Sequence, residues 1–223
     1  MAEYLMGIDA GTGSVRVALF DFRGQNRAYA VAEYGTTYPK NGWAEQSDYE
    51  WFEALKKAIP ECIKKAGIAA DNIAAITCDA TTNTLVYLDE NDTSVRPPIL
   101  WMDVRATEEA SFIDTIREEY DATKFYKPGF RADTMVPKCM WVKKNEPENW
   151  AKTKTIMEFE DWLNWKLTGR KTVSMSVAAF RWNYDDKNGG YPVDFYNAVG
   201  LDDVVDKTDQ TAGFPVDVPC EMA

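Results

Sequence analysis

The sequence of 223 residues contains no histidine. This absence excludes Ser-His-Asp and Cys-His nucleophile systems, so any general base within the chain is an aspartate, glutamate, lysine or tyrosine. The four cysteines, Cys62, Cys78, Cys139 and Cys220, are scattered and form no Cys-x-x-Cys pair. Without such a pair or a histidine, the chain offers no zinc-binding pattern.

Basic clusters and long apolar runs are also missing. The chain has 36 acidic and 25 basic residues and a formal net charge of −11, and such a surface repels nucleic acid phosphates and anionic lipids. No apolar run approaches the ~20 residues of a membrane span, and the first residues lack the basic segment of a secretory signal. We therefore expect no nucleic acid or membrane partner, a reducing cytoplasmic location and unpaired thiols.

Two familiar phosphate-binding patterns are incomplete near the N-terminus. Gly11 and Gly13 follow a short apolar strand, but Arg16 replaces the third glycine of a dinucleotide-binding motif and the next residues are strand-like. No Gly-Lys-Ser/Thr of a Walker P-loop occurs. Two interpretations remain: a glycine hairpin whose backbone N–H groups face an anion, or a tight turn whose glycines supply positive φ angles.

The polar residues around this hairpin suit a phosphate together with a divalent cation. Asp9 ends the first strand and is the candidate metal ligand, since carboxylates hold Mg²⁺, usually through water. The candidate phosphate-binding residues are those of the hairpin and the cation after it: Gly11, Thr12, Gly13, Ser14 and Arg16. The alternative for Arg16 is an exposed strand cation without a ligand.

The order of the predicted elements favours an α/β fold with a mixed sheet and flanking helices. Strands at residues 4–8, 15–22 and 27–34, joined by tight turns, predict an antiparallel meander. A helix follows, with an N-cap at Ser47 and a C-cap at Gly67. The other predicted elements are strands at 73–77 and 84–88 and helices at 104–120, 136–145 and 160–167.

A series of motifs, in order along the chain, resembles the FGGY family of carbohydrate kinases. The hairpin segment 7–16 resembles the first phosphate motif of the wider actin-like ATPase superfamily, and segments 42–47, 96–106, 137–147 and 161–169 resemble successive FGGY motifs. The resemblance covers nearly the whole chain. It implies a ribonuclease-H-like, actin-type domain over residues 1–223, the sugar-binding N-terminal domain, with the C-terminal ATP-binding domain absent from this chain.

The resemblance also implies an activity and a substrate pocket. The expected reaction moves the γ-phosphoryl group of ATP to a hydroxyl of a sugar or polyol, with Mg²⁺ as the second cofactor. Sugar hydroxyls pair well with planar and charged side chains. The candidate sugar-binding residues are Thr82, Asn83, Trp101, Asp103, Arg105 and Arg181. The alternatives are a core position for Trp101 and a salt bridge between Asp103 and Arg105.

The segment Thr81-Thr82-Asn83-Thr84 departs from two branches of the family. It carries neither the Gln-Met-His-Gly of xylulokinases nor the Arg-Glu of glycerol kinases. The preceding Asp79-Ala80 and the Trp-Met-Asp-x-Arg-Ala segment are nearer to ribulokinases. We therefore expect a ketopentose such as ribulose, with xylulose, erythritol and glycerol as alternatives.

The family's catalytic aspartate is expected beyond Ala223, so we expect no catalytic base in this chain and no turnover by the chain alone. The missing half is expected to leave apolar surface uncovered, which favours a homodimer. Two interpretations of other classes stay open. One is an actin-like structural ATPase, and the other is a sugar-binding module that performs no catalysis.

Overall fold

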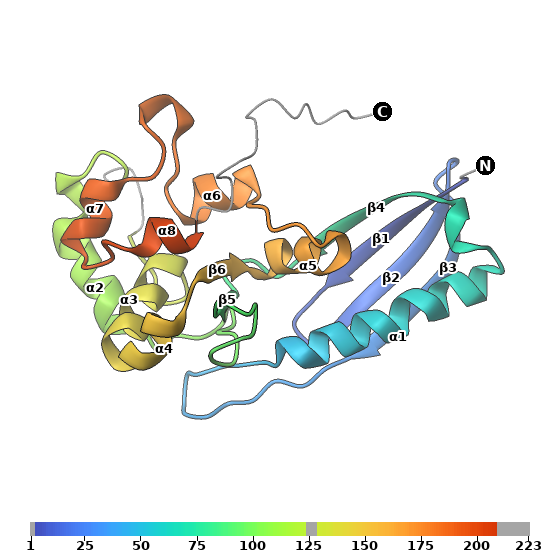
Figure 1. The fold of residues 1–223 in the computed structure, drawn as a ribbon, viewed down its shortest axis with the longest axis horizontal. Helices are drawn as coiled ribbons and strands as arrows, with labels where there is room; N and C mark the ends of the chain where they lie inside the picture. Colours follow the sequence, from blue (N-terminus) through green and yellow to red (C-terminus); the bar gives the residue numbers. More distant parts are fainter. Residues whose placement is uncertain (1–2, 124–128, 209–223) are drawn as a thin grey trace.

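The computed structural model describes residues 3–123 and 129–208 of the chain. Figure 1 shows two lobes that meet near the middle of the molecule: a long sheet with one helix lying along it, and a group of shorter helices. Two clusters of buried apolar side chains form the core, one in each lobe.

The larger sheet has the strand order β3-β2-β1-β4. Its strands are β1 (Tyr4–Ala10), β2 (Ser14–Asp21), β3 (Asn26–Glu33) and β4 (Ile73–Ala80). The first three form the antiparallel meander, and β4 pairs with β1 in parallel, so the predicted mixed sheet is confirmed. In this register Asp9 of β1 lies between Arg16 of β2 and Asp79 of β4.

Helix α1 (Asp48–Ala66) covers one face of the sheet and is the predicted capped helix. The Ser47 side chain accepts a hydrogen bond from the Glu50 N–H at 3.4 Å, and Gly67 ends the helix in the left-handed conformation. The Glu50 carboxylate accepts from the Gly35 N–H at 3.1 Å, which ties the helix to the segment after β3. Pro60 lies inside the helix and does not end it.

The smaller sheet pairs β5 (Leu85–Leu88) with β6 (Thr155–Glu158) in antiparallel. It lies between the two cores, because successive side chains of β5 point alternately into each of them. Leu85 and Tyr87 belong to the cluster of the helical lobe, and Val86 and Leu88 belong to the cluster of the sheet lobe. A strand buried on both faces shows no polar alternation, and β6 was absent from the sequence prediction for that reason.

Seven helices of the described residues follow α1 along the chain. They are α2 (Thr107–Ile116), α3 (Met135–Asn145), α4 (Pro147–Lys152), α5 (Phe159–Thr168), α6 (Met175–Arg181), α7 (Val193–Ala198) and α8 (Val204–Thr208). Three of them, α2, α3 and α5, correspond to the predicted helices. The other four have seven residues or fewer, too short for a periodic pattern to be recognised.

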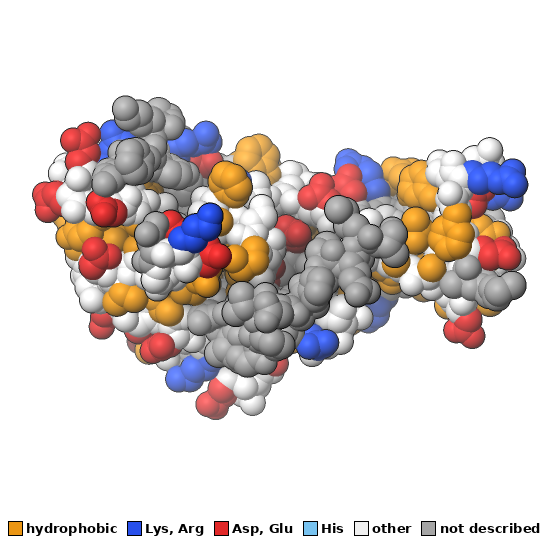
Figure 2. All heavy atoms as spheres, turned by 90° about the horizontal axis from the view of Figure 1, so that it is seen from above, with side chains coloured by type: hydrophobic (Ala, Val, Ile, Leu, Met, Phe, Trp, Pro, Cys, Tyr) orange, Lys and Arg blue, Asp and Glu red, His pale blue; other side chains and the backbone are white. Residues whose placement is uncertain are grey.

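The face of the larger sheet opposite α1 is partly bare. Leu5, Tyr29 and Ile76 are exposed there or at its edge, and Figure 2 shows apolar side chains gathered over the sheet lobe. In the described part of the chain no helix combines the length and apolarity needed to cross a bilayer. The cysteines of that part, Cys62, Cys78 and Cys139, are free thiols, and Cys220 lies outside it.

Candidate functional site

Asp9 stands at the end of β1 on the bare face of the sheet. The Arg16 guanidinium contacts the Asp9 carboxylate, with Nη1 and Oδ2 2.8 Å apart, and both side chains are about half exposed, at 47% and 53%. The hydrogen bond to Asp9 raises the pKa of Arg16. Asp79 lies on the other side of Asp9, directly opposite it in the parallel register. These residues line a hollow of about 360 Å³.

The hairpin between β1 and β2 has its carbonyl groups fixed from behind. The Tyr34 hydroxyl donates to the Gly11 carbonyl, the Gln46 side chain donates to the Thr12 carbonyl, and the Tyr34 N–H donates to the Gly13 carbonyl. Burial raises the pKa of Tyr34, so its hydroxyl remains a protonated donor. The three carbonyl groups of the hairpin therefore already have donors within the protein.

The backbone N–H groups of Thr12 and Gly13 donate to no atom within residues 3–123 and 129–208. A Cβ atom added to Gly13 would meet nothing within 4 Å, so the space beside this residue is open. Neither Gly11 nor Gly13 has a positive φ, and the interpretation that the glycines serve only to supply such angles is wrong. Open space beside free N–H groups is what an approaching anion requires.

The same region fits Mg²⁺ only together with another ligand. No group of three or more carboxylate, thiol or imidazole side chains capable of holding a metal occurs among the described residues. Asp9 and Asp79 are two exposed carboxylates on one face of adjacent strands. Mg²⁺ commonly uses one or two carboxylates and completes its octahedron with phosphate oxygens and water. The carboxylates therefore suit a cation that is shared with a bound phosphate.

A second polar group forms where β4, β6 and α6 approach one another. Arg181 Nε donates to Thr82 Oγ1 at 2.8 Å, and the Thr82 hydroxyl donates to Glu158 Oε1 at 2.8 Å. The Asn83 N–H donates to the same Glu158 oxygen. The structure thus brings together three of the predicted sugar-binding residues from positions about a hundred residues apart in the chain.

Glu158 is the residue of this group that the sequence analysis missed. It is 1% exposed, and burial raises the pKa of its carboxyl group. Two acceptor atoms here, Glu158 Oε2 and Asn83 Oδ1, are buried with no hydrogen-bond partner in the described structure. The sequence offers one signal for Glu158, an acidic residue directly after the apolar Ile156-Met157. No neighbouring residue indicates that its partner is Thr82.

Trp101 connects the two polar groups. Its indole Nε1–H donates to Thr12 Oγ1 at 3.0 Å, and its backbone N–H donates to Thr84 Oγ1 at 3.2 Å. The side chain is 40% exposed, so it is not a core residue. Trp101 therefore connects the glycine hairpin, through its indole, with the segment that holds Thr82 and Asn83, through its backbone.

Asp103 and Arg105 are brought together but are enclosed in the interior, and both side chains are 0% exposed. Asp103 accepts hydrogen bonds from the Ala44 N–H and from the Arg105 guanidinium, at 2.6 to 2.9 Å. The guanidinium also packs against the rings of Trp43 and Trp141, 4.0 and 5.0 Å from their centres. Because no ligand can reach either side chain in this state, we do not retain them as direct sugar contacts.

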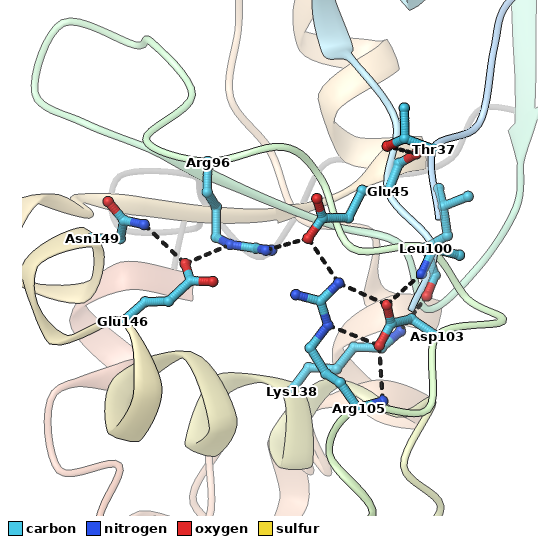
Figure 3. A network of polar contacts seen from close by, with 10 residues as sticks. Thr37, Glu45, Arg96, Leu100, Asp103, Arg105, Lys138, Glu146 and Asn149 are labelled. Atoms are coloured by element: carbon cyan, nitrogen blue, oxygen red, sulfur yellow. Dashed lines mark hydrogen bonds and ion pairs between the residues drawn. The ribbon is translucent and has the colours of Figure 1, made fainter. Parts of the chain in front are cut away.

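These two residues belong to a buried network that Figure 3 shows from close by. Glu45 Oε1 accepts from Arg105 and from Arg96, both at 2.7 Å, and Arg96 continues to Glu146 at 2.8 Å. Lys138 approaches from α3 beneath the same loops and donates to the carbonyls of Asn83 and Leu100. Through Lys138, this buried region contacts the backbone of Asn83 and of Leu100, the residue before the exposed Trp101.

The model of the FGGY family of carbohydrate kinases, N-terminal domain, matches residues 4–204. A xylulose kinase from Lactococcus lactis subsp. lactis is 30% identical over 213 residues, which cover 93% of this chain and 42% of that protein. An FGGY carbohydrate kinase domain-containing protein from Homo sapiens is 30% identical over 213 residues, covering 91% and 38%.

The fold has solved counterparts as well. The crystal structure of a xylulose kinase from Brucella ovis aligns with a TM-score of 0.78 at 25% identity, covering 89% of this chain and 41% of that chain. The chain thus spans about two fifths of the length of these relatives. The likeness confirms the predicted ribonuclease-H-like, actin-type α/β fold.

Proposed function

The chain belongs to the FGGY family of carbohydrate kinases, and on that premise we propose that its protein transfers the γ-phosphoryl group of ATP to a sugar hydroxyl. The observation that carries the proposal is the bond between Trp101 Nε1 and Thr12 Oγ1 at 3.0 Å. This bond supports the proposal because it joins the hairpin that we assign to the phosphate to Trp101, which we assign to the sugar. A phosphoryl transferase needs these two kinds of site in contact, because its catalysis consists mainly of positioning and charge stabilisation.

At the phosphate end, the free N–H groups of Thr12 and Gly13 hold the transferring phosphate, and Ser14 adds a hydroxyl donor. Arg16 orients Asp9, and Asp9 with Asp79 would hold Mg²⁺. When bound, Mg²⁺ neutralises charge on the phosphate oxygens. The proposal assigns the general base that takes the proton of the sugar hydroxyl to none of these residues.

At the sugar end, Thr82, Asn83 and Arg181 offer donors and acceptors to neighbouring hydroxyl groups, and Glu158 holds the first two in place. The exposed Trp101 ring packs against the carbon side of the sugar, as aromatic faces do in sugar sites. A short, hydroxyl-rich ketopentose suits this small polar group. Ribulose is the substrate that the sequence motifs favour, and xylulose is the alternative that the kinase from Lactococcus lactis suggests.

The test is ADP release by the product of the complete reading frame. The substrates are D- and L-ribulose, D- and L-xylulose, erythritol and glycerol, and Asp9→Asn is compared with Asp71→Asn, a change at an exposed aspartate away from the site. We expect turnover on one ketopentose that Asp9→Asn removes and Asp71→Asn leaves intact. Absence of turnover on every substrate would refute the kinase proposal and favour a sugar-binding module without catalysis.

We also propose that these 223 residues, expressed alone, form a homodimer through the bare face of the larger sheet. Leu5 is 42%, Tyr29 48% and Val31 38% exposed on that face, and contiguous apolar surface promotes association. Light scattering over a dilution series measures the mass, and Tyr29→Lys is expected to shift it to the monomer. A monomer at every concentration would contradict the proposal.

A further inference from the structure

Asn83 has an unusual backbone conformation for a residue with a side chain. Its φ is +60°, in the left-handed region that glycine favours. Asparagine adopts this region more readily than most residues, but Asn83 is 8% exposed and its Oδ1 has no partner in the described structure, so no hydrogen bond of that oxygen stabilises the conformation. Strained backbone of this kind persists only where the surroundings hold it, and it is concentrated at functional sites.

Two side chains hold Asn83 from opposite ends of its backbone. Its N–H donates to Glu158 Oε1, and its carbonyl accepts from Lys138 Nζ at 2.7 Å. Glu158 comes from the end of β6, and Lys138 comes from the middle of α3. Neither element is near Asn83 in sequence, so the conformation is imposed by tertiary contacts.

Lys138 performs a second function with the same nitrogen. Nζ also donates to the Leu100 carbonyl at 2.8 Å, and Leu100 directly precedes Trp101. One buried amine thus joins the segment of Thr82 and Asn83 to the segment of Trp101. Figure 3 shows Lys138 passing beneath Asp103 and Arg105 toward Leu100.

A lysine is an unusual residue for a fully buried position. The side chain is 0% exposed and makes no ion pair with a carboxylate among the described residues. Burial lowers the pKa of Lys138 to about 7, a direction that Asp103, Asp133 and Glu158 oppose and Arg105 reinforces. A buried amine without a counter-ion is costly, so the two hydrogen bonds that it donates to the Asn83 and Leu100 carbonyls are the property that the site uses.

We propose that Lys138 and Glu158 are positioning residues that hold Asn83 from both sides and fix the Thr82–Asn83 segment against Trp101 for sugar binding. The inference rests on the proposed function, because the held segments are the ones assigned to the sugar. Neither residue touches the sugar itself. Both residues act mainly on sugar affinity, because their hydrogen bonds go to Thr82, Asn83 and Leu100 and not to the hairpin.

The test compares kcat, KM for the sugar and KM for ATP in the complete protein, with the ketopentose that it phosphorylates. Lys138→Met and Glu158→Met remove the hydrogen bonds at similar volume, and each is expected to raise KM for the sugar by about tenfold or more. KM for ATP is expected to stay within about twofold. Glu158→Gln keeps an acceptor oxygen and is expected to restore most of the sugar affinity.

A double-mutant cycle and a control on the same helix sharpen the test. Because both residues hold Asn83, the effects of Lys138→Met and Glu158→Met are expected to be less than additive. Lys144→Met, an exposed lysine of α3 on the outer surface, is expected to behave as the wild type. Folded variants with unchanged KM for the sugar, or equal increases in both KM values, would overturn the inference.

Hydrogen exchange separates this inference from the proposed function. Exchange in a peptide covering residues 81–85 is expected to be faster in Glu158→Met and in Lys138→Met than in Lys144→Met, whether or not any sugar is phosphorylated. Unchanged exchange would overturn the inference that Lys138 and Glu158 hold Asn83. If the wild type phosphorylates no sugar while exchange is faster in Glu158→Met and Lys138→Met, the proposed function fails, and the inference that these residues hold Asn83 stands. If Lys138→Met does not fold, Glu158→Met and Glu158→Gln decide the matter.

Discussion

Two of the Arg–Asp pairs among the described residues have the same contact distance and opposite surroundings. Arg16 and Asp9 meet at 2.8 Å with both side chains about half exposed, whereas Arg105 and Asp103 meet at 2.8 Å with both fully buried. The first pair faces a hollow beside free backbone N–H groups, and the second is enclosed by two tryptophan rings. An exposed pair can exchange one partner for a ligand at small cost, but a buried pair cannot.

The largest expected effect follows from breaking the buried pair. Asp103→Ala leaves the Arg105 guanidinium buried beside Glu45 alone, and we expect the free energy of unfolding to fall by about 3–5 kcal/mol. Urea unfolding followed by tryptophan fluorescence measures this loss. Asp202→Ala removes an aspartate that also pairs with a cation, Lys143, but is exposed, and it serves as the control. A loss below about 1 kcal/mol would show that the buried pair is not a structural element.

A buried aspartate that lacks a cation sharpens the comparison. Asp161 is 2% exposed, accepts from the Ser174 N–H at 2.8 Å, and pairs with no cation among the described residues. Burial raises the pKa of Asp161 to about 7, above the ordinary 3.8. Between these values the folded state binds more protons than the unfolded state, so stability falls as the pH rises from about 4 to about 7, by up to ~1.4 kcal/mol per pH unit.

Asp161→Asn is expected to remove this contribution, since an amide keeps an acceptor oxygen and does not titrate. The variant should therefore gain stability over the wild type at pH 8 relative to pH 5. Urea midpoints at both pH values give the difference, and Glu148→Gln, an exposed carboxylate, is the control. Parallel changes in wild type and Asp161→Asn between the two pH values would show that Asp161 is ionised in the folded state at pH 5.

The smallest expected change in stability belongs to the exposed pair. Asp9→Asn is expected to alter the free energy of unfolding by less than about 1 kcal/mol, because water replaces the lost contact. The same variant is expected to abolish sugar phosphorylation by the complete protein. Unfolding and activity measured on one preparation separate the two effects. A stability loss as large as that of Asp103→Ala would mean that Asp9 acts as a structural residue.

Local signals in the sequence were sufficient for the sheet lobe. The meander follows from alternating apolar residues and tight turns, and α1 follows from Ser47 and Gly67, because each signal lies within a few residues of the element it defines. The helical lobe gave fewer signals. Its shortest helices and the doubly buried β6 acquire their structure from packing, which no short window of sequence contains.

The site shows the same limit at single residues. The motifs identified Asp103 and Arg105 but could not indicate that both side chains are buried. A sequence motif gives the residue types and does not say whether a side chain points to the interior or to solvent. Glu158 escaped detection because its partner Thr82 lies far away along the chain. By contrast, Asp9 and the hairpin could be proposed from the sequence because they are contiguous in it.

The hydrogen bond between Trp101 and Thr12 makes one contact common to both proposed binding sites. A sugar that reorients the Trp101 indole weakens or strengthens the hydrogen bond that Trp101 donates to Thr12. A nucleotide that binds the Thr12 hydroxyl in turn changes the acceptor of this hydrogen bond. Thermodynamic linkage then requires each ligand to change the affinity of the other by the same factor. Because the chain has eight tryptophans, the part of the fluorescence change on binding that Trp101→Phe removes would report both binding events from this one position.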